Sequence, residues 1–173
     1  MRPLLLVALM LLYACQAKPK NESATTTTDT TATVRVDLTK KPAPDAPRTA
    51  ADRLVRALYF EHRVKENPFF ETGDPTLAGQ FFTKPMAEKV VAYARKPGKK
   101  GVLNPLFNVP DKQAEKMWVL PATIAGERAA VFITYTHNGK PREMRCEMTR
   151  QADRFRIADI VYANGARLTE TLR

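Results

Sequence analysis

The N-terminal half of the chain carries apolar residues at helical spacing in three segments. Thr49, with an aspartate three residues later, forms a candidate capping box, and the apolar repeat behind it predicts a helix over 49–65. Asp74-Pro75 has the cap and first-position chemistry that begins a second, short helix. Thr83 begins a third helix, which Pro97-Gly98 ends.

From Trp118 onward the apolar period changes from helical spacing to a pattern that favours strands. The pattern predicts strands over 117–124 and 129–137, and Asn138-Gly139 favours a two-residue type I′ turn into a third strand. If this turn forms, Val131 lies opposite Cys146 and the two residues share one face of the hairpin. That face is mostly apolar and the other is mostly polar, as expected for a sheet packed on helices.

The last predicted strand covers 155–162, and a short closing helix follows that carries Leu168 and Leu172. This strand is apolar on both faces except at Asp159, so we expect it in the centre of the sheet. The sequence therefore predicts an α+β domain over 48–173. It consists of three N-terminal helices packed on a curved antiparallel sheet of about four strands, with a short C-terminal helix.

The N-terminal residues have the parts of a secretory signal, with Met1 and Arg2 ahead of an unbroken apolar run over 4–12. A helix of that length covers only about half of a ~30 Å hydrocarbon core, so export is favoured over a retained membrane span. We expect residues 1–14 to be a signal peptide cut between Ala14 and Cys15.

The residues Leu12-Tyr13-Ala14-Cys15 resemble the lipobox of bacterial lipoproteins. The resemblance implies a diacylglycerol thioether on Cys15 and a fatty acid on its freed amine, which together anchor a protein stably to a membrane. An ordinary signal peptide with an incidental cysteine is the alternative. Gln16 follows the cysteine in place of the Asp that retains many lipoproteins in the inner membrane. The expected location is therefore the periplasmic face of the outer membrane, with the inner membrane less favoured.

Residues 15–47 form the predicted lipidated cysteine and tether. The segment 16–47 lacks aromatic residues and is rich in Thr, Ala, Lys and Pro, so it cannot bury enough apolar surface to offset its ordering entropy. Within it, residues 33–38 alternate between apolar and polar side chains. Either this is compositional noise or the segment adds to the edge of a sheet.

The net charge is +10, from 28 basic and 18 acidic residues. For an exported protein the matching anions are lipid headgroups, cell-wall carboxylates or an acidic partner, and nucleic acid is not expected. A generally basic surface without a dedicated partner explains the charge equally well. Lys96, Lys99 and Lys100 have no acidic neighbours in the sequence and are candidates for contact with an anionic partner; a solvated loop is the alternative.

The predicted domain resembles the NTF2-like (cystatin-like) superfamily, and in particular the YbjP-like lipoproteins of unknown function. The resemblance rests on the helix from Thr49, on Asp74-Pro75 and on the pattern from Phe155 through Asp159 to Gly165. It implies a cone between helices and sheet that some members use as a catalytic pocket.

The candidate residues for such a pocket are Tyr59, His62, Tyr93, Trp118, Tyr135 and Asp159. An inward Asp159 would act as a general base with a raised pKa, although a structural hydrogen bond is the favoured interpretation. Cys146 is expected to be a buried apolar residue, and the spacing of His and Cys predicts no metal site and no cofactor.

These observations favour a non-enzymatic accessory lipoprotein that is held at a membrane by Cys15 and binds or stabilises another envelope protein. Two alternatives remain open. An immunity lipoprotein against a secreted antibacterial effector needs the same anchor and a binding face. A small-ligand-binding or isomerase-like cone needs a hollow, largely apolar pocket that contains Asp159.

Overall fold

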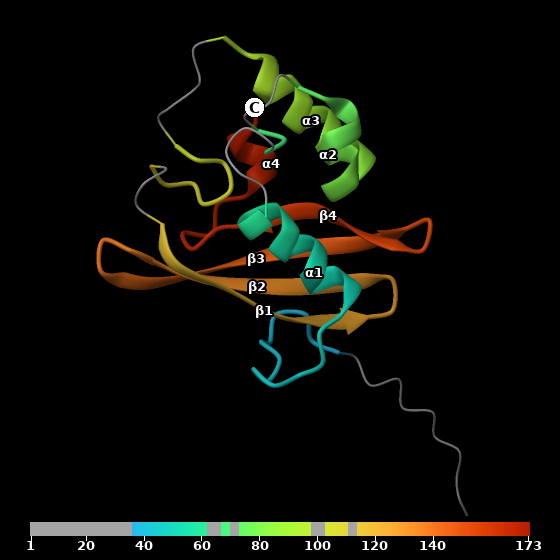
Figure 1. The fold of residues 1–173 in the computed structure, drawn as a ribbon, viewed down its shortest axis with the longest axis vertical. Helices are drawn as coiled ribbons and strands as arrows, with labels where there is room; N and C mark the ends of the chain where they lie inside the picture. The colour runs from blue at the N-terminus through green and yellow to red at the C-terminus, as the bar shows by residue number, and fades with distance from the viewer. Residues whose placement is uncertain (1–35, 62–66, 70–72, 98–102, 111–113) are drawn as a thin grey trace, which may run out of the picture. The chain divides into compact units, whose positions relative to one another are not determined.

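A four-stranded antiparallel sheet in the order β1-β2-β3-β4 organises the computed structural model (Figure 1). The structure describes residues 36–61, 67–69, 73–97, 103–110 and 114–173, and all of these belong to one compact unit that spans Val34–Arg173. The predicted signal peptide, the lipobox with Cys15 and most of the predicted tether lie outside the described residues.

Three N-terminal helices precede the sheet, as the sequence predicts. Helix α1 spans Ala50–Arg56 and continues as a π-helical segment, η1, over Ala57–Glu61. Helix α2 spans Pro75–Phe81 and α3 spans Lys84–Arg95. The predicted caps are present, because the Asp52 carboxylate accepts the Thr49 backbone N–H at 2.6 Å and the Asp74 carboxylate accepts the Thr76 N–H at 2.8 Å.

The strands follow in meander order. They are β1 over Glu115–Ala125, β2 over Arg128–His137, β3 over Lys140–Gln151 and β4 over Arg154–Val161. Asn138 and Gly139 both have positive φ, and the predicted register is confirmed, with Val131 opposite Cys146 and His137 opposite Lys140. Pro121 is tolerated in β1 because this strand is at the sheet edge and its register shifts between Val119 and Ala122.

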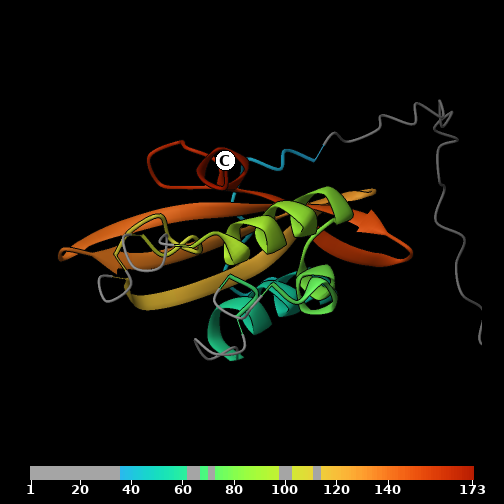
Figure 2. The same cartoon turned by 90° about the horizontal axis from the view of Figure 1, so that it is seen from above.

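The prediction that the last strand is central is wrong, because β4 is an edge strand. The strand is apolar on both faces although it lies at the edge, because other parts of the chain cover it. Its edge is covered where Phe82 pairs with Ile157, and the Thr83 N–H donates to the Ile157 carbonyl at 2.9 Å. Beyond β4, the chain folds back into the short helix α4, Leu168–Thr171. Figure 2 shows α1 and α4 on opposite sides of the sheet.

The hydrophobic core lies between the helices and one face of the sheet, which we call the helix-side face. It includes Val55 and Leu58 of the first helical segment, Val90 of α3, and Cys146 and Ile157 of the sheet. The opposite face, which we call the outer face, carries the residues that alternate with these, among them the polar side chains of β3. The described helices include none long and apolar enough to cross a bilayer.

Residues 36–48, which we call the N-terminal strap, contact the sheet although 36–47 belong to the predicted tether. Lys41 forms an ion pair with Glu143 of β3 at 2.5 Å, and the Thr123 hydroxyl of β1 donates to the Lys40 carbonyl at 3.2 Å. Arg48 donates to the Val119 carbonyl at 2.8 Å. The described end of the alternating segment, 36–38, is not part of a strand.

Candidate functional site

Three tyrosine hydroxyls contact one backbone segment at one end of the space between helices and sheet. Tyr59 of η1 donates to the Leu106 carbonyl at 2.9 Å, and Tyr162, just after β4, donates to the Pro105 carbonyl at 2.5 Å. Tyr135 of β2 makes a longer contact, 3.5 Å, with the Phe107 carbonyl. Three consecutive backbone carbonyls are thus each met by a hydroxyl from a different element.

The segment that these tyrosines hold, residues 104–109, is called the plug. Asn104 and Val109 pair with each other at its two ends, and the Asn104 side chain accepts the Leu106 N–H at 2.9 Å. The Phe107 ring lies between the rings of Tyr59 and Tyr135, with centroid separations of 5.4 and 5.3 Å. Aromatic side chains and the plug backbone therefore pack into this end of the space between helices and sheet, and a small pocket of about 200 Å³ remains beside Phe107, Tyr135 and Tyr162.

Burial makes these tyrosines structural hydrogen-bond donors rather than acids or bases. It raises the pKa of Tyr59 and Tyr162 well above the usual tyrosine value, and it also raises the pKa of Tyr135. Burial likewise raises the pKa of the Cys146 thiol to about 12, so this cysteine remains a neutral core side chain.

Of the five candidate pocket residues in the described part of the chain, Tyr59 and Tyr135 are the two that lie together, and they do so around the plug. Tyr93 on α3 is half-buried, with its ring edge-on to Phe69 at 6.4 Å. Trp118 on β1 is 55% exposed and lies beneath the Arg48 guanidinium, 5.9 Å from its ring centroid. His62 lies outside the described residues.

Asp159 lies on the outer face, where it anchors α4. Its carboxylate accepts the Thr169 N–H at 3.1 Å, the Thr169 hydroxyl at 2.9 Å and the Arg167 Nε–H at 2.8 Å. It does not point inward because the register shifts next to its partner Glu147, leaving Ala158 as an extra residue on β4. Asp159 thus makes the structural hydrogen bonds favoured from the sequence.

Glu147, beside Asp159, completes a cluster of alternating charges. Arg145 donates to its carboxylate at 2.7 Å, and Arg167 binds it from the other side while also binding Asp159. Burial alone would raise the pKa of Glu147, but the hydrogen bonds from the two arginines outweigh burial and lower this pKa. The hydrogen bond to Asp159, followed by that to Glu147, raises the pKa of Arg167.

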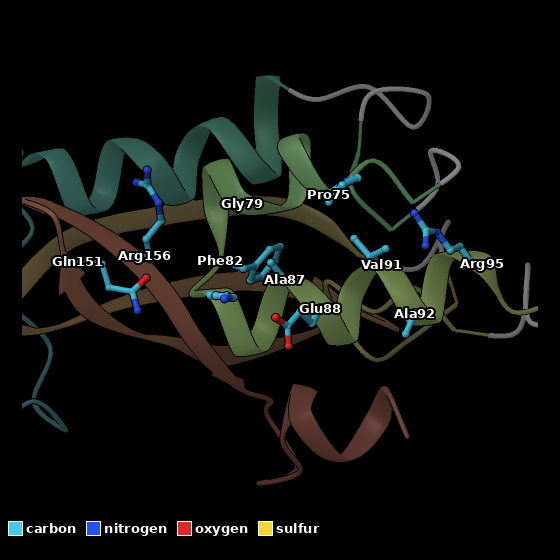
Figure 3. A pocket seen from close by; sticks show the side chains of 11 residues that line it. Pro75, Gly79, Phe82, Ala87, Glu88, Val91, Ala92, Arg95, Gln151 and Arg156 are labelled. Carbon is cyan, nitrogen blue, oxygen red and sulfur yellow. The ribbon is translucent and has the colours of Figure 1, made fainter.

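A groove of about 580 Å³, the α2–α3 groove, opens between these two helices and the end of the β3–β4 hairpin (Figure 3). Phe82, Ala87 and Val91 supply apolar lining. Figure 3 shows Arg156 of β4 toward one end of the groove and Arg95 toward the other. The Arg95 guanidinium is held by the Gly73 carbonyl, to which it donates at 3.1 Å.

A second groove of about 700 Å³, the hairpin groove, lies between α1, α2 and the β3–β4 hairpin and shares Arg156 with the first. Its apolar lining includes Leu54 and Phe155, and its charged lining adds Arg150 and Arg154. Arg150 stacks over the Phe155 ring at 4.8 Å. Both grooves therefore combine arginine side chains with apolar surface.

The basic residues singled out from the sequence are not among the described residues that line these grooves. Lys96 caps the end of α3 and is partly buried, whereas Lys99 and Lys100 lie outside the described residues. Lys84, Arg95 and Arg156 line the α2–α3 groove together, and the sequence does not reveal this grouping because three cations far apart in the chain give no local charge run. The described residues contain no cluster of His, Cys, Asp and Glu suited to a metal ion.

Comparisons of the chain with protein-family models, with curated proteins and with solved structures found no match.

Proposed function

We propose that this protein is a membrane-anchored accessory lipoprotein whose folded domain binds a protein partner in the bacterial envelope and carries out no reaction itself. Acyl chains on Cys15 supply the anchor, the preceding residues 1–14 direct export, and the expected location is the periplasmic face of the outer membrane. The lipobox pattern at Leu12-Tyr13-Ala14-Cys15 supports the anchor.

One structural observation carries the choice of a binding role over a catalytic one. The plug and the tyrosines that hold it occupy the place where a cone-shaped enzyme would receive its substrate, and Asp159 is committed to α4 on the other side of the sheet. A general base needs access to a substrate proton, and Asp159 lies outside that space. Open, mixed apolar and basic grooves are instead the features on which a partner can dock.

The anchor is tested by metabolic labelling with an alkyne analogue of palmitate, followed by membrane fractionation. The unaltered protein should incorporate the label and sediment with membranes, and Cys15→Ser should lose both properties. Cys146→Ala is the matched control, because it removes the other cysteine of the chain and should leave labelling unchanged. Labelling that persists in Cys15→Ser would refute the anchor.

The binding role is tested by crosslinking in intact cells and affinity purification of the full chain. A defined envelope protein should be recovered repeatedly, and it should be the same protein when Asp159→Asn is used as bait. Recovery of no protein partner, or a reaction abolished by Asp159→Asn, would contradict the proposal.

A further inference from the structure

The α2–α3 groove and the hairpin groove meet at Arg156, which lines both. We propose that together they form one docking surface, and that its occupant is an acidic segment of the protein partner in which apolar residues alternate with carboxylates. This inference rests on the proposed function and adds the place and the chemistry of the contact.

Charge is the first argument. The α2–α3 groove is lined by the cations Lys84, Arg95 and Arg156 and by a single carboxylate, that of Glu88. Among the described residues, no ion pair involves any of these three cations. Cations that border an apolar groove in this way attract an occupant with carboxylates at matching positions.

The spacing of the cations selects a protein segment over a lipid. Lys84 and Arg95 are the first and last residues of α3, so their backbones are about 16 Å apart along the helix axis. A lipid carries its charge in one headgroup at one end of its chains, and it would be matched by cations gathered at one end. A peptide carries separate carboxylates, and about five extended residues or three helical turns cover 16 Å.

The surface of α2 is the second argument. Gly79 lies inside this helix, where glycine destabilises relative to alanine, and a side-chain carbon built on it would meet nothing within 4 Å. Packing against the described part of the chain thus gives no reason for a glycine here. Its effect is to expose helix backbone at the groove, where the backbone or side chain of a partner can approach closely.

The hairpin groove continues the same pattern. Arg154 and Arg156 project from β4 beside the apolar surface of Leu54 and Phe155, and Asp153 is the one acidic residue in its lining. The described residues form no ion pair with Arg154. An occupant longer than the α2–α3 groove therefore meets further cations in the adjoining groove.

The test places a photo-crosslinking amino acid in the full-length, membrane-attached protein in the cells that produce it. Gly79 and Ala92 are the groove positions, because both are exposed and line the α2–α3 groove. Lys140, exposed at the β2–β3 turn, is the control position. We expect one protein adduct at 79 and 92 and none at 140, with the crosslinked peptide carrying Asp or Glu beside apolar residues.

The charge requirement is tested with a synthetic peptide of the crosslinked segment. Lys84→Glu should weaken its binding about fivefold, and Lys84→Glu with Arg156→Gln should weaken it further, whereas Lys84→Arg should bind as the unaltered protein does. An acidic residue at the first position of α3 suits the helix dipole, so Lys84→Glu leaves folding intact, which circular dichroism verifies. Replacing by Lys only the acidic residue of the peptide that faces position 84 should restore binding to Lys84→Glu, because the other carboxylates still face Arg95 and Arg156.

The contrary outcomes are distinct. A lipid adduct at 79 and 92, a captured segment without carboxylates, an equal adduct at all three positions or no adduct at any of them overturns the docking surface. A protein adduct found only at Lys140 also overturns the docking surface but leaves the proposed function standing. If the unaltered protein takes up no palmitate label, that result counts against the proposed function and not against the groove.

Discussion

Removing the hydroxyls that hold the plug should destabilise the domain in an order set by their geometry. Tyr162→Phe and Tyr59→Phe each remove a short hydrogen bond, at 2.5 and 2.9 Å, and leave a buried carbonyl without its partner. An orphaned buried acceptor costs about 1–3 kcal/mol. Tyr135→Phe removes a contact at 3.5 Å, the limit of a hydrogen bond, so its cost should be below about 0.5 kcal/mol.

Urea unfolding measures these costs as differences in the free energy of unfolding. With a slope of about 2 kcal/mol per molar urea, a loss of 2 kcal/mol lowers the midpoint by about 1 M, whereas Tyr135→Phe should shift it by less than about 0.3 M. The double variant of Tyr59 and Tyr162 should differ from the sum of the two single variants, because both hydroxyls hold the same plug.

Amide hydrogen exchange locates the effect. The N–H groups of Leu106 and Phe107 bond within the plug, to the Asn104 side chain and carbonyl. Their exchange should accelerate in Tyr162→Phe, while the amides in the middle of β2 and β3 remain protected. Equal costs for all three substitutions, or unchanged exchange of the Leu106 and Phe107 amides, would refute the conclusion that the Tyr59 and Tyr162 hydroxyls hold the plug in place.

Four further predictions concern other parts of the domain. Burial raises the pKa of Cys146 to about 12, so its contribution to stability is complete below the unfolded thiol value of about 8.5 and is lost as the pH rises toward 12. From pH 8 to pH 10 the free energy of unfolding, measured with urea under reducing conditions, should fall by about 2 kcal/mol through this thiol. Cys146→Ala should remove this part of the pH dependence, and an unchanged pH dependence would contradict the assignment. Ala152 and Asp153 both have positive φ in the β3–β4 turn, so replacing them with Asn-Gly should raise the free energy of unfolding by about 1–2 kcal/mol, and a lower thermal midpoint would be the contrary result. Gly79→Ala should raise the free energy of unfolding, measured with urea, by about 0.5–1 kcal/mol. A lower free energy of unfolding would show that another part of the chain packs on this position. Asp159→Asn should destabilise by about 1–2 kcal/mol by weakening charged hydrogen bonds to α4, and a neutral result would show that these bonds contribute nothing net.

The sequence predicts the meander of strands well because its signals are local. Asn138-Gly139 sets the turn type, the turn sets the register, and the register places Val131 and Cys146 together on the helix-side face. The caps at Thr49 and Asp74 are equally local and are confirmed.

The position of β4 and the orientation of Asp159 could not be predicted in the same way. Alternation counted from Ile157 places Asp159 on the helix-side face, but Ala158 is an extra residue in the β3–β4 pairing and moves Asp159 to the outer face. A bulge of this kind has no sequence signature here. The burial of β4 comes from α4 and from the contact with Phe82, neither of which alternation along the strand reveals.

The plug escaped prediction for a related reason. Pro105, Leu106 and Phe107 form a short apolar run without a period, and their carbonyls have partners from η1, β2 and the end of β4. Only the folded chain brings these three elements to one place. The lining of the α2–α3 groove is also nonlocal, because Arg156 of β4 shares it with Lys84 and Arg95 of α3.

The N-terminal strap has a mechanical consequence. A force applied at Val36 and directed away from the domain reaches the Lys41–Glu143 ion pair and the Thr123–Lys40 hydrogen bond before it reaches the Arg48 contacts at the start of α1. The Lys41–Glu143 pair and the Thr123–Lys40 hydrogen bond are surface contacts of modest strength, so we expect these two to open first while the core stays folded. A fully released strap of 13 residues spans at most about 45 Å, so the distance between Val36 and the domain can lengthen under load without unfolding of the core.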